Sequence, residues 1–398
     1  MTQISKRVQN LSPSATLAMS QKSAEMRARG IDVINMSVGE PDFNTPDFIK
    51  EAAKSAIDEN YSRYTPVPGY MTLRKAISEK LRRENGLEYA PEQIVVGNGA
   101  KQELGNALLA LVNPGDEVVI PTPAWVSYIE LVKLAEGIPV TIPSGVEDDF
   151  KVTPEKLEAA ITPRTRMIML NTPSNPTGSV YTLEELTALA EVIKRHENVM
   201  VLADDIYEHI NFVEGRVASI AQVEGMADRV VIINGVSKAY AMTGWRIGFM
   251  AGPIAVAKAV TKLQGQTTSG ASSIAQKAAE AAYNGPQDCV EDMRKAFERR
   301  RDLIVSLARE IPGWKVNCPQ GAFYLFPQVE GCLGKRSGDK VIRTSGDYVE
   351  YILDEAHVAC VDGAAFSAPG YMRLSYATSD ENIREAMRRI REATDKLK

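Results

Sequence analysis

The hydrophobic positions of this chain follow two alternating patterns, short continuous apolar runs and longer stretches of helical periodicity. The apolar runs are typical of buried strands and cover 93–96, 117–120, 167–170, 199–203, 230–233 and 247–251. Helix-like stretches follow most of them, at 101–112, 125–134, 183–195 and 254–264. Continuous apolar strands separated by helices predict an α/β fold with a mostly parallel sheet covered by helices on both faces.

The two ends of the chain follow a different pattern. Before the sheet region, helices are predicted at 12–30, 46–59 and 71–85, with a short strand at 32–37. After it comes a charged helical stretch from 272 to about 309, then short strands at 316–317, 322–326, 358–361 and 372–375 around helices at 347–355 and 381–396. This mixture predicts a smaller α+β domain formed by both chain ends. We therefore expect an N-terminal arm and part of the small domain in 1–45, a large domain in 46–285, and the small C-terminal domain in 286–398.

Composition narrows the class of protein. The chain has 398 residues, 44% hydrophobic and 24% charged, which suffices for two sizeable cores. No run approaches the roughly 18 apolar residues of a membrane span, and residues 1–7 lack the apolar core of a signal peptide, so we expect a cytoplasmic protein. A net charge of −5 with interspersed signs argues against nucleic acid binding. The four cysteines and three histidines are scattered, so no metal site is expected and a small molecule is the expected partner.

One lysine is a candidate for covalent chemistry. Lys238 lies just beyond the apolar run 230–233, among small residues. Burial at such a strand end would disfavour the ammonium form, so that a free amine could attack an aldehyde carbon. A single lysine in a loop is more often a plain surface residue. The assignment therefore depends on what lies near it.

Other candidate residues follow the ends of neighbouring strands, where open parallel sheets bind ligands. The turn Gly97–Gln102 could direct backbone N–H groups at an anion, or be only a tight strand-to-helix connection. Trp125 could stack on a flat ring or serve in packing, and the proline-fixed loop around Asn175 could hold that amide in place. Asp204 ends a buried strand and needs a cationic or N–H partner, unless it caps a helix.

Arg246, eight positions beyond Lys238, could bind an anion beside it or form a structural ion pair. Taken together, these residues offer a Schiff-base lysine, an acid for a ring nitrogen, a stacking ring and a phosphate cradle. Pyridoxal phosphate requires this combination, because its electron sink needs a protonated ring nitrogen and a polarised imine.

Several motifs carry a family resemblance. The chain resembles the fold-type I pyridoxal-phosphate aminotransferases in Asn175-Pro176-Thr177-Gly178, Asp204-x-x-Tyr207, Ser237-Lys238-Ala239-Tyr240 and Met242–Gly248. It resembles more narrowly the bacterial class I aspartate aminotransferases of subgroup Ib in Pro13–Thr16, Gly39–Phe43, Tyr64-Thr65-Pro66 and Gly363–Phe366. The similarity runs from about Ser5 to the C-terminus.

The resemblance implies roles around the ring of pyridoxal 5'-phosphate. Lys238 would form the Schiff base with the cofactor and then move a proton to and from the substrate's α-carbon. Asp204 would pair with the pyridine nitrogen, while Tyr207 and Asn175 would contact the phenolic oxygen. Trp125 would stack on the ring beside the substrate. Two donors on the phenolic oxygen and a carboxylate at the ring nitrogen favour the reactive protonation states.

The resemblance also implies the phosphate and substrate contacts. The phosphate ligands would be the backbone N–H groups of Gly99, Ala100 and Lys101, joined by Ser237 and Arg246. Tyr64 would reach the phosphate of the other subunit in a homodimer. Arg373 would bind the substrate α-carboxylate as a bidentate fork, with Gly39 and Asn175 beside it. Lys101 would reach the distal carboxylate of an acidic substrate.

The expected reaction is ping-pong transamination between aspartate and 2-oxoglutarate, giving oxaloacetate and glutamate. A preference for aromatic donors, prephenate or a broader range is the alternative, because Ala100 and Ser12 depart from the subgroup's common glycine and basic residue. β-Elimination or decarboxylation on the same fold stays open. A nicotinamide dehydrogenase is disfavoured because Gln102 replaces the last glycine of its fingerprint. A non-catalytic DNA-binding regulator is disfavoured because no basic helix is present.

Overall fold

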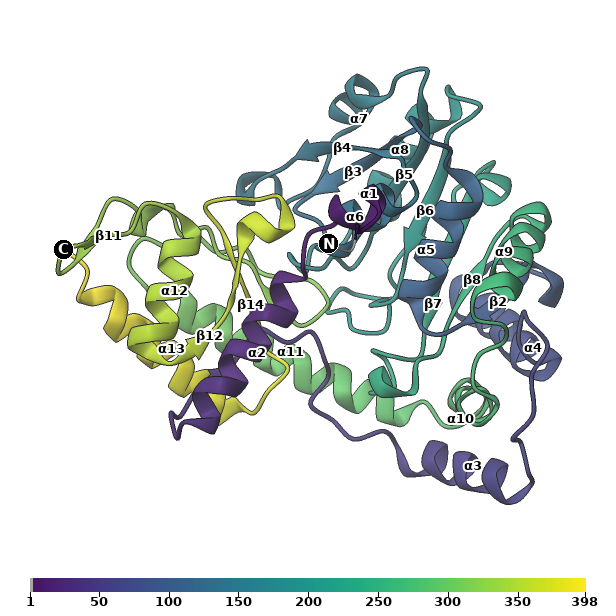
Figure 1. Ribbon diagram of the computed structural model, residues 1–398, viewed down its shortest axis with the longest axis horizontal. Helices are drawn as coiled ribbons and strands as arrows, with labels where there is room; N and C mark the ends of the chain where they lie inside the picture. The colour runs from purple at the N-terminus through teal and green to yellow at the C-terminus, as the bar shows by residue number, and fades with distance from the viewer. Residues whose placement is uncertain (1–2) are drawn as a thin grey trace.

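The computed structural model describes residues 3–398 and consists of two lobes (Figure 1). The large lobe is built on a seven-stranded sheet. Its strands lie in the order β2 (Ile94–Gly97), β8 (Gly248–Ala251), β7 (Val230–Gly235), β6 (Met200–Asp204), β5 (Thr165–Asn171), β3 (Glu117–Thr122) and β4 (Ile138–Pro143). Within this sheet only β8 runs antiparallel to its neighbours. The predicted α/β fold with a mostly parallel sheet is confirmed.

Successive strand residues point to opposite faces of this sheet, so each face has its own core. Val95 packs in the core under α5 (Ala100–Leu111), α6 (Ser127–Leu134) and α9 (Ile254–Thr267), while its neighbour Val96 packs in the opposite core. That second core is covered by α3 (Asp47–Asp58), α4 (Met71–Lys80), α7 (Pro154–Ala160), α8 (Leu183–Lys194) and α10 (Ser273–Asn284). Strands buried on both faces explain the continuous apolar runs of the sequence.

Two helix starts predicted from capping residues are confirmed. Thr182 accepts a hydrogen bond from the Glu185 N–H, and the Glu185 carboxylate accepts one from the Thr182 N–H, which forms a capping box at the start of α8. Thr153 caps α7, with Pro154 at its first helical position. These local signals fix the residues at which α7 and α8 begin.

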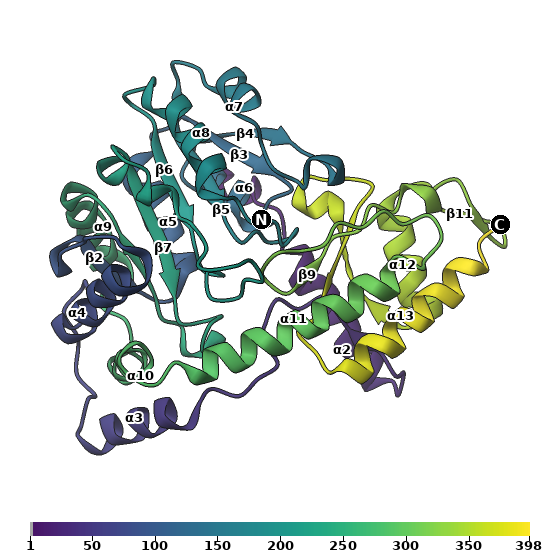
Figure 2. The same ribbon diagram turned by 180° about the vertical axis from the view of Figure 1, so that it is seen from behind.

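The small lobe joins both chain ends. Strand β1 (Ile34–Asn35) pairs in parallel with β12 (Val358–Ala359), and β14 (Met372–Ser375) lies between β13 (Val361–Asp362) and β9 (Tyr324–Leu325). The helices of this lobe are α2 (Ala15–Ala28), α12 (Ser345–Ala356) and α13 (Asp380–Asp395). The purple α2 lies against the yellow-green C-terminal elements in both views (Figures 1 and 2).

Several sequence predictions need correction. The helical stretch predicted from 272 to 309 is two helices, α10 and α11 (Asp288–Ala308), because Gly285-Pro286 breaks it. Strand β4 was missed, since it is a largely exposed edge strand with two prolines. The predicted helix at 12–30 corresponds to α2, while the short α1 (Lys6–Gln9) before it was missed. The predicted strand at 316–317 is only an isolated bridge from Lys315 to Gln328. The hairpin β10 (Arg336–Ser337) and β11 (Lys340–Val341) was also missed.

Helix α11 runs along one side of the molecule from the large lobe to the small one (Figure 2). The segment from 36 to 46 makes a second connection, from β1 to α3. Among residues 3–398, no helix combines the length and apolarity that crossing a membrane requires.

Candidate active site

A cavity of about 370 Å³ opens at the carboxyl ends of the parallel strands, where the two lobes meet. Most residues predicted for the site line this one cavity: Gly39, Ala100, Lys101, Trp125, Asn175, Asp204, Tyr207, Ser237, Lys238, Arg246 and Arg373. Gly39 and Arg373, which are 334 positions apart in the chain, therefore line the same cavity. The position agrees with the usual ligand site of open α/β sheets.

Lys238 lies in the loop after β7. Its Nζ donates a hydrogen bond of 2.7 Å to the Gly39 carbonyl oxygen and lies 5.7 Å from the centre of the Tyr207 ring. Desolvation in the cavity lowers the pKa of the Lys238 ammonium to about 8, partly opposed by the Glu40 carboxylate. The free amine is therefore accessible near neutral pH, as nucleophilic attack on a carbonyl carbon requires.

Asp204 is the last residue of β6 and is buried. Its carboxylate accepts hydrogen bonds from the Tyr128 hydroxyl at 2.6 Å and from the Ile206 N–H at 3.3 Å. Burial raises the pKa of the Asp204 carboxyl to about 6, with these hydrogen bonds opposing the shift. A buried carboxylate that two neutral donors contact suits a ligand cation such as a protonated ring nitrogen.

Arg373, in β14, is 1% exposed. Its Nη1 donates to Asn175 Oδ1 at 2.9 Å and its Nη2 donates to the Ser37 carbonyl oxygen at 2.6 Å. Its guanidinium carbon lies 4.5 Å from the Tyr324 ring centre, and its buried Nε has no hydrogen-bond partner among residues 3–398. Both oxygen acceptors are neutral, so an anionic ligand is the missing partner of this guanidinium.

The start of α5 forms a cradle for a second anion. Gly99 has a φ of +87°, and a Cβ there would come within 2.8 Å of Cζ of Arg246, so the guanidinium lies directly against the backbone. Arg246 donates to the carbonyl oxygens of Thr243 at 2.8 Å and Asn98 at 3.2 Å. In the described part of the chain this guanidinium has no carboxylate partner. Together with the helix N–H groups, it favours a phosphate.

Lys101 lies on the first turn of the same helix. Its Nζ is 5.0 Å from the Trp125 ring centre. Desolvation and the Arg246 charge lower the pKa of the Lys101 ammonium. An ammonium held near another cation favours a negatively charged ligand group.

Sequence reasoning missed two tyrosines of the site. Tyr324 is fully buried and its hydroxyl is 2.8 Å from the Tyr207 hydroxyl, while Tyr128 donates to Asp204. Both line the cavity. A signal existed for Tyr128, which follows Trp125 by three positions on one helical face. Tyr324 lies within the predicted strand 322–326 and looked like a core residue.

Tyr64 and Ser12 do not line the cavity. The Tyr64 side chain is 99% exposed, which is unusual for a tyrosine on a single chain. Ser12 is exposed, and its N–H donates to a Glu130 carboxylate oxygen at 2.8 Å.

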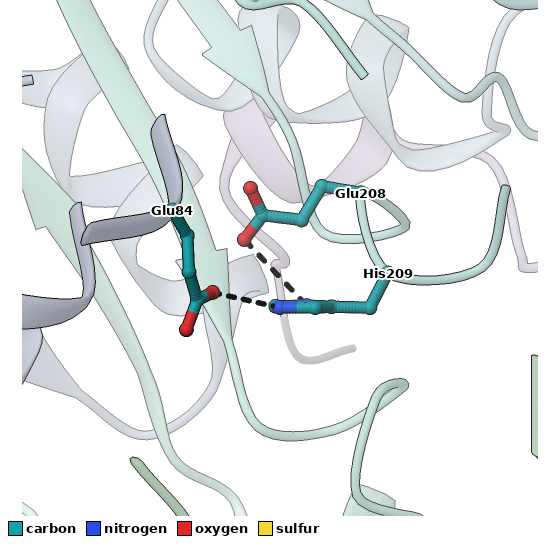
Figure 3. Close-up of side chains that lie close together, drawn as sticks. All are labelled: Glu84, Glu208 and His209. Carbon is teal, nitrogen blue, oxygen red and sulfur yellow. Dashed lines mark hydrogen bonds and ion pairs between the residues drawn. The ribbon is translucent and has the colours of Figure 1, made fainter. Parts of the chain in front are cut away.

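A separate ionic cluster of Glu84, Glu208 and His209 does not line the cavity (Figure 3). His209 Nε2 is 2.9 Å from Glu84 Oε2 and its Nδ1 is 3.7 Å from Glu208 Oε1. The buried Lys80 ammonium bonds Glu208 directly and lies 3.6 Å from Glu84. Because Lys80 already supplies a cation to both carboxylates, the cluster is an ion-pair network that fixes the loop after Tyr207.

Comparisons with known proteins agree with this geometry. Residues 31–390 match the family model for aminotransferase class I and II. The chain belongs to this family of aminotransferases. It is 51% identical over 392 residues to an aspartate/prephenate aminotransferase of Cereibacter sphaeroides, covering 98% of each chain.

Solved structures are similar over the whole chain. The aspartate aminotransferase of Rhizobium meliloti superimposes with a TM-score of 0.97 at 46% identity, covering 100% of both chains. The aspartate aminotransferase of Thermus thermophilus with maleate superimposes with a TM-score of 0.92 at 40% identity, covering 99% of this chain and 100% of that one.

The cavity fits pyridoxal phosphate. Among residues 3–398, no cation is hydrogen-bonded to the buried Asp204 carboxylate, and the Arg246 guanidinium in the Gly99 cradle has only carbonyl partners. These two anchors suit a ring cation and a phosphate, with Lys238 in the same cavity for the aldehyde.

Proposed function

We propose that this enzyme transfers the amino group between L-aspartate and 2-oxoglutarate, giving oxaloacetate and L-glutamate, with pyridoxal 5'-phosphate as cofactor. The observation that carries the proposal is that one cavity holds the Lys238 amine together with Arg373 and Lys101, two cationic side chains in addition to Arg246, which we assign to the phosphate. A dicarboxylic amino acid has two anionic groups to pair with them. The names of the relatives also point to aspartate.

The cofactor, when bound, supplies an electron sink that stabilises negative charge at the substrate's α-carbon. Asp204 would keep the ring nitrogen protonated, and the Tyr207 hydroxyl and Asn175 amide would donate to the phenolic oxygen. Burial raises the pKa of the Tyr207 hydroxyl well above its usual value, so this group stays a donor. Trp125 would cover one face of the ring.

The backbone N–H groups of Gly99, Ala100 and Lys101 would hold the phosphate, together with Ser237 and Arg246. Arg373 would bind the α-carboxylate and orient the α-carbon toward Lys238. The Lys238 amine, whose pKa lies near 8, would accept the proton from that carbon. Lys101 would pair with the distal carboxylate and so select an acidic side chain.

We further infer a homodimer in which Tyr64 reaches the phosphate bound to the partner subunit. A tyrosine that is 99% exposed on the single chain supports this assignment. We also assign 46–285 to a large domain, and 1–45 with 286–398 to a small one that closes over the substrate. Gly39 and Arg373 then belong to the closing part, and Lys238 to the fixed part.

A panel of amino donors against 2-oxoglutarate tests the proposal. We expect aspartate to exceed alanine and tyrosine by at least about tenfold in kcat/KM, since each lost charged contact costs on the order of tenfold or more. Aromatic or neutral donors that react far faster than aspartate would contradict it. Prephenate belongs in the panel as a second acceptor, because the Cereibacter relative is named for both substrates.

A further inference from the structure

The linker of residues 39–45 joins the two lobes beside the cavity. It is hydrogen-bonded to the segment between β7 and β8, which contains Lys238. Its Gly39 carbonyl accepts the Lys238 hydrogen bond of 2.7 Å. At its other end, Thr45 Oγ1 accepts a hydrogen bond of 3.1 Å from Trp245 Nε1. The linker therefore forms part of the cavity wall, and its position sets the contact of Gly39 with the reactive lysine.

Helix α11 contacts the middle of the linker through Arg300. Arg300 donates two hydrogen bonds to Asp42, from Nη1 to Oδ1 at 2.7 Å and from Nη2 to Oδ2 at 2.9 Å. The Arg300 guanidinium carbon lies 5.1 Å from the Phe43 ring centre and 5.7 Å from the Phe297 ring centre. Its side chain is 9% exposed. A bidentate, desolvated fork flanked by two rings is a strong and directional contact.

The same helix also reaches the cavity through aromatic rings. Phe297 stacks on Phe323 with ring centres 5.2 Å apart and an interplanar angle of 30°. Phe323 lies edge-on to Tyr207 at 5.6 Å, and its ring centre is 5.9 Å from Lys238 Nζ. A shift of Arg300 would therefore displace both the linker at Gly39 and the aromatic rings that contact Tyr207 and Lys238.

We propose that Arg300 is a positioning residue, which holds the linker through Asp42 so that Gly39 and the substrate end of the cavity stay aligned with Lys238. Neither Arg300 nor Asp42 lines the cavity, so the effect is indirect. Arg300 also lies within α11, the helix that connects the two lobes (Figure 2). The Arg300–Asp42 contact therefore links the two connections between the lobes, α11 and the linker. The inference rests on the proposed function, because it assigns Arg300 a part in binding that substrate.

The neighbouring residue offers a matched control. Arg299 makes the same kind of fork, to Asp380, with both hydrogen bonds at 3.0 Å, but its side chain is 62% exposed. Asp380 lies 3.6 Å from Nε of Arg300, so Arg299→Lys alters the surroundings of the fork without breaking it. A general effect of changing α11 would appear in both variants.

The test compares wild-type holoenzyme with Arg300→Lys, Asp42→Asn and Arg299→Lys. We measure kcat and KM for aspartate and the Kd of maleate, a dicarboxylate that does not react. We also measure hydrogen–deuterium exchange of the linker. We expect Arg300→Lys and Asp42→Asn to raise KM and the maleate Kd by about 10- to 100-fold, with faster exchange in the linker, because a displacement near 1 Å has effects of this size. Arg299→Lys should stay within about twofold of wild type.

Maleate affinity and linker exchange that stay within twofold of wild type in Arg300→Lys would overturn the proposal. Asp42→Asn keeps the buried arginine packed against Phe43 and Phe297, so it remains informative if the arginine variant fails to fold. The exchange measurement needs no substrate. A wild-type enzyme inactive on aspartate would therefore contradict the proposed function, while the exchange of the linker would still decide the positioning role.

Discussion

The Nζ of Lys238 lies 2.7 Å from the carbonyl oxygen of Gly39, so the reactive amine of the large lobe is hydrogen-bonded to the segment that leads from the small lobe. A backbone carbonyl accepts this bond without neutralising the ammonium charge. Desolvation therefore remains the main cause of the lowered pKa of Lys238. The nucleophile and the wall of the substrate site are thus fixed by one contact.

The lowered pKa predicts how cofactor attachment depends on pH. Because only the free amine attacks the aldehyde, the rate of attachment to the apoenzyme should rise about tenfold per pH unit below about 8 and level off above it. Stopped-flow absorbance of the visible cofactor band measures this rate. An inflection near the ordinary lysine value, above pH 10, would show that the cavity does not desolvate this amine.

Asp204→Asn should separate stability from activity. The folded pKa of Asp204 is raised from 3.8 to about 6, so ionisation destabilises the folded apoenzyme progressively as pH rises through this window. The variant should then be more stable than wild type at pH 8 by on the order of 3 kcal/mol, and the difference should shrink toward pH 4. Denaturant unfolding of the apoenzymes measures it. The kcat of the loaded variant should fall by about 100-fold or more, because the ring nitrogen loses its counter-ion.

Asp205→Asn is the matched control for this prediction. Burial and Glu208 raise the pKa of the neighbouring Asp205 to about 8, but Asp205 does not line the cavity. This variant should also stabilise the apoenzyme at high pH while leaving kcat near wild type. Equal losses of kcat in both variants would argue against a specific contact of Asp204 with the cofactor.

Lys101→Met tests the choice of an acidic substrate. Removing the ammonium should lower kcat/KM for aspartate by about 10- to 100-fold and leave alanine within about threefold, since only aspartate has a distal carboxylate. Steady-state kinetics with both donors measures the ratio. Lys133→Met, whose ammonium pairs with Glu130 at 2.9 Å outside the cavity, is the control and should change neither donor. Equal losses for both donors in Lys101→Met would point to a defect in phosphate binding instead.

Hybrid dimers test the role of Tyr64. A mixed dimer of one Tyr64→Phe chain and one Lys238→Ala chain has one site with both changes and one site with neither, if Tyr64 acts on the partner subunit. Activity per hybrid should therefore reach about half that of wild type. If Tyr64 acts within its own chain, the hybrid should be no better than half of the Tyr64→Phe homodimer. Differently tagged chains allow the hybrid to be purified.

Much of the fold and most of the cavity were predictable from the sequence for physical reasons. Strands buried on both faces leave continuous apolar runs, and ligands of an open sheet gather where those runs end. Arg373 was found only through family resemblance, although an arginine inside a buried strand was itself a signal. Tyr324 was missed because a lone aromatic in a strand looks like a core residue, and its hydroxyl contact with Tyr207 depends on tertiary structure.

The helix break at 285–286 shows a different limit. Helical periodicity continues on both sides of Gly285-Pro286, so the pattern suggested one long helix, while the glycine–proline pair indicated a stop. The helix ends there because proline lacks a backbone N–H and its ring clashes with the preceding turn, whatever the periodicity of the side chains. The break also lets α11 take its own direction between the lobes (Figure 2), which places Arg300 beside Asp42.

Mapping the covalent attachment tests the central claim most directly. The holoenzyme is reduced with borohydride, digested and analysed by mass spectrometry, with Lys238→Ala treated in parallel. We predict one modified peptide, with the pyridoxyl group on Lys238, no modified peptide in the variant, and a loss of turnover of at least about 1000-fold in that variant. A pyridoxyl group on another lysine such as Lys101, or near-normal transamination by Lys238→Ala, would contradict the account.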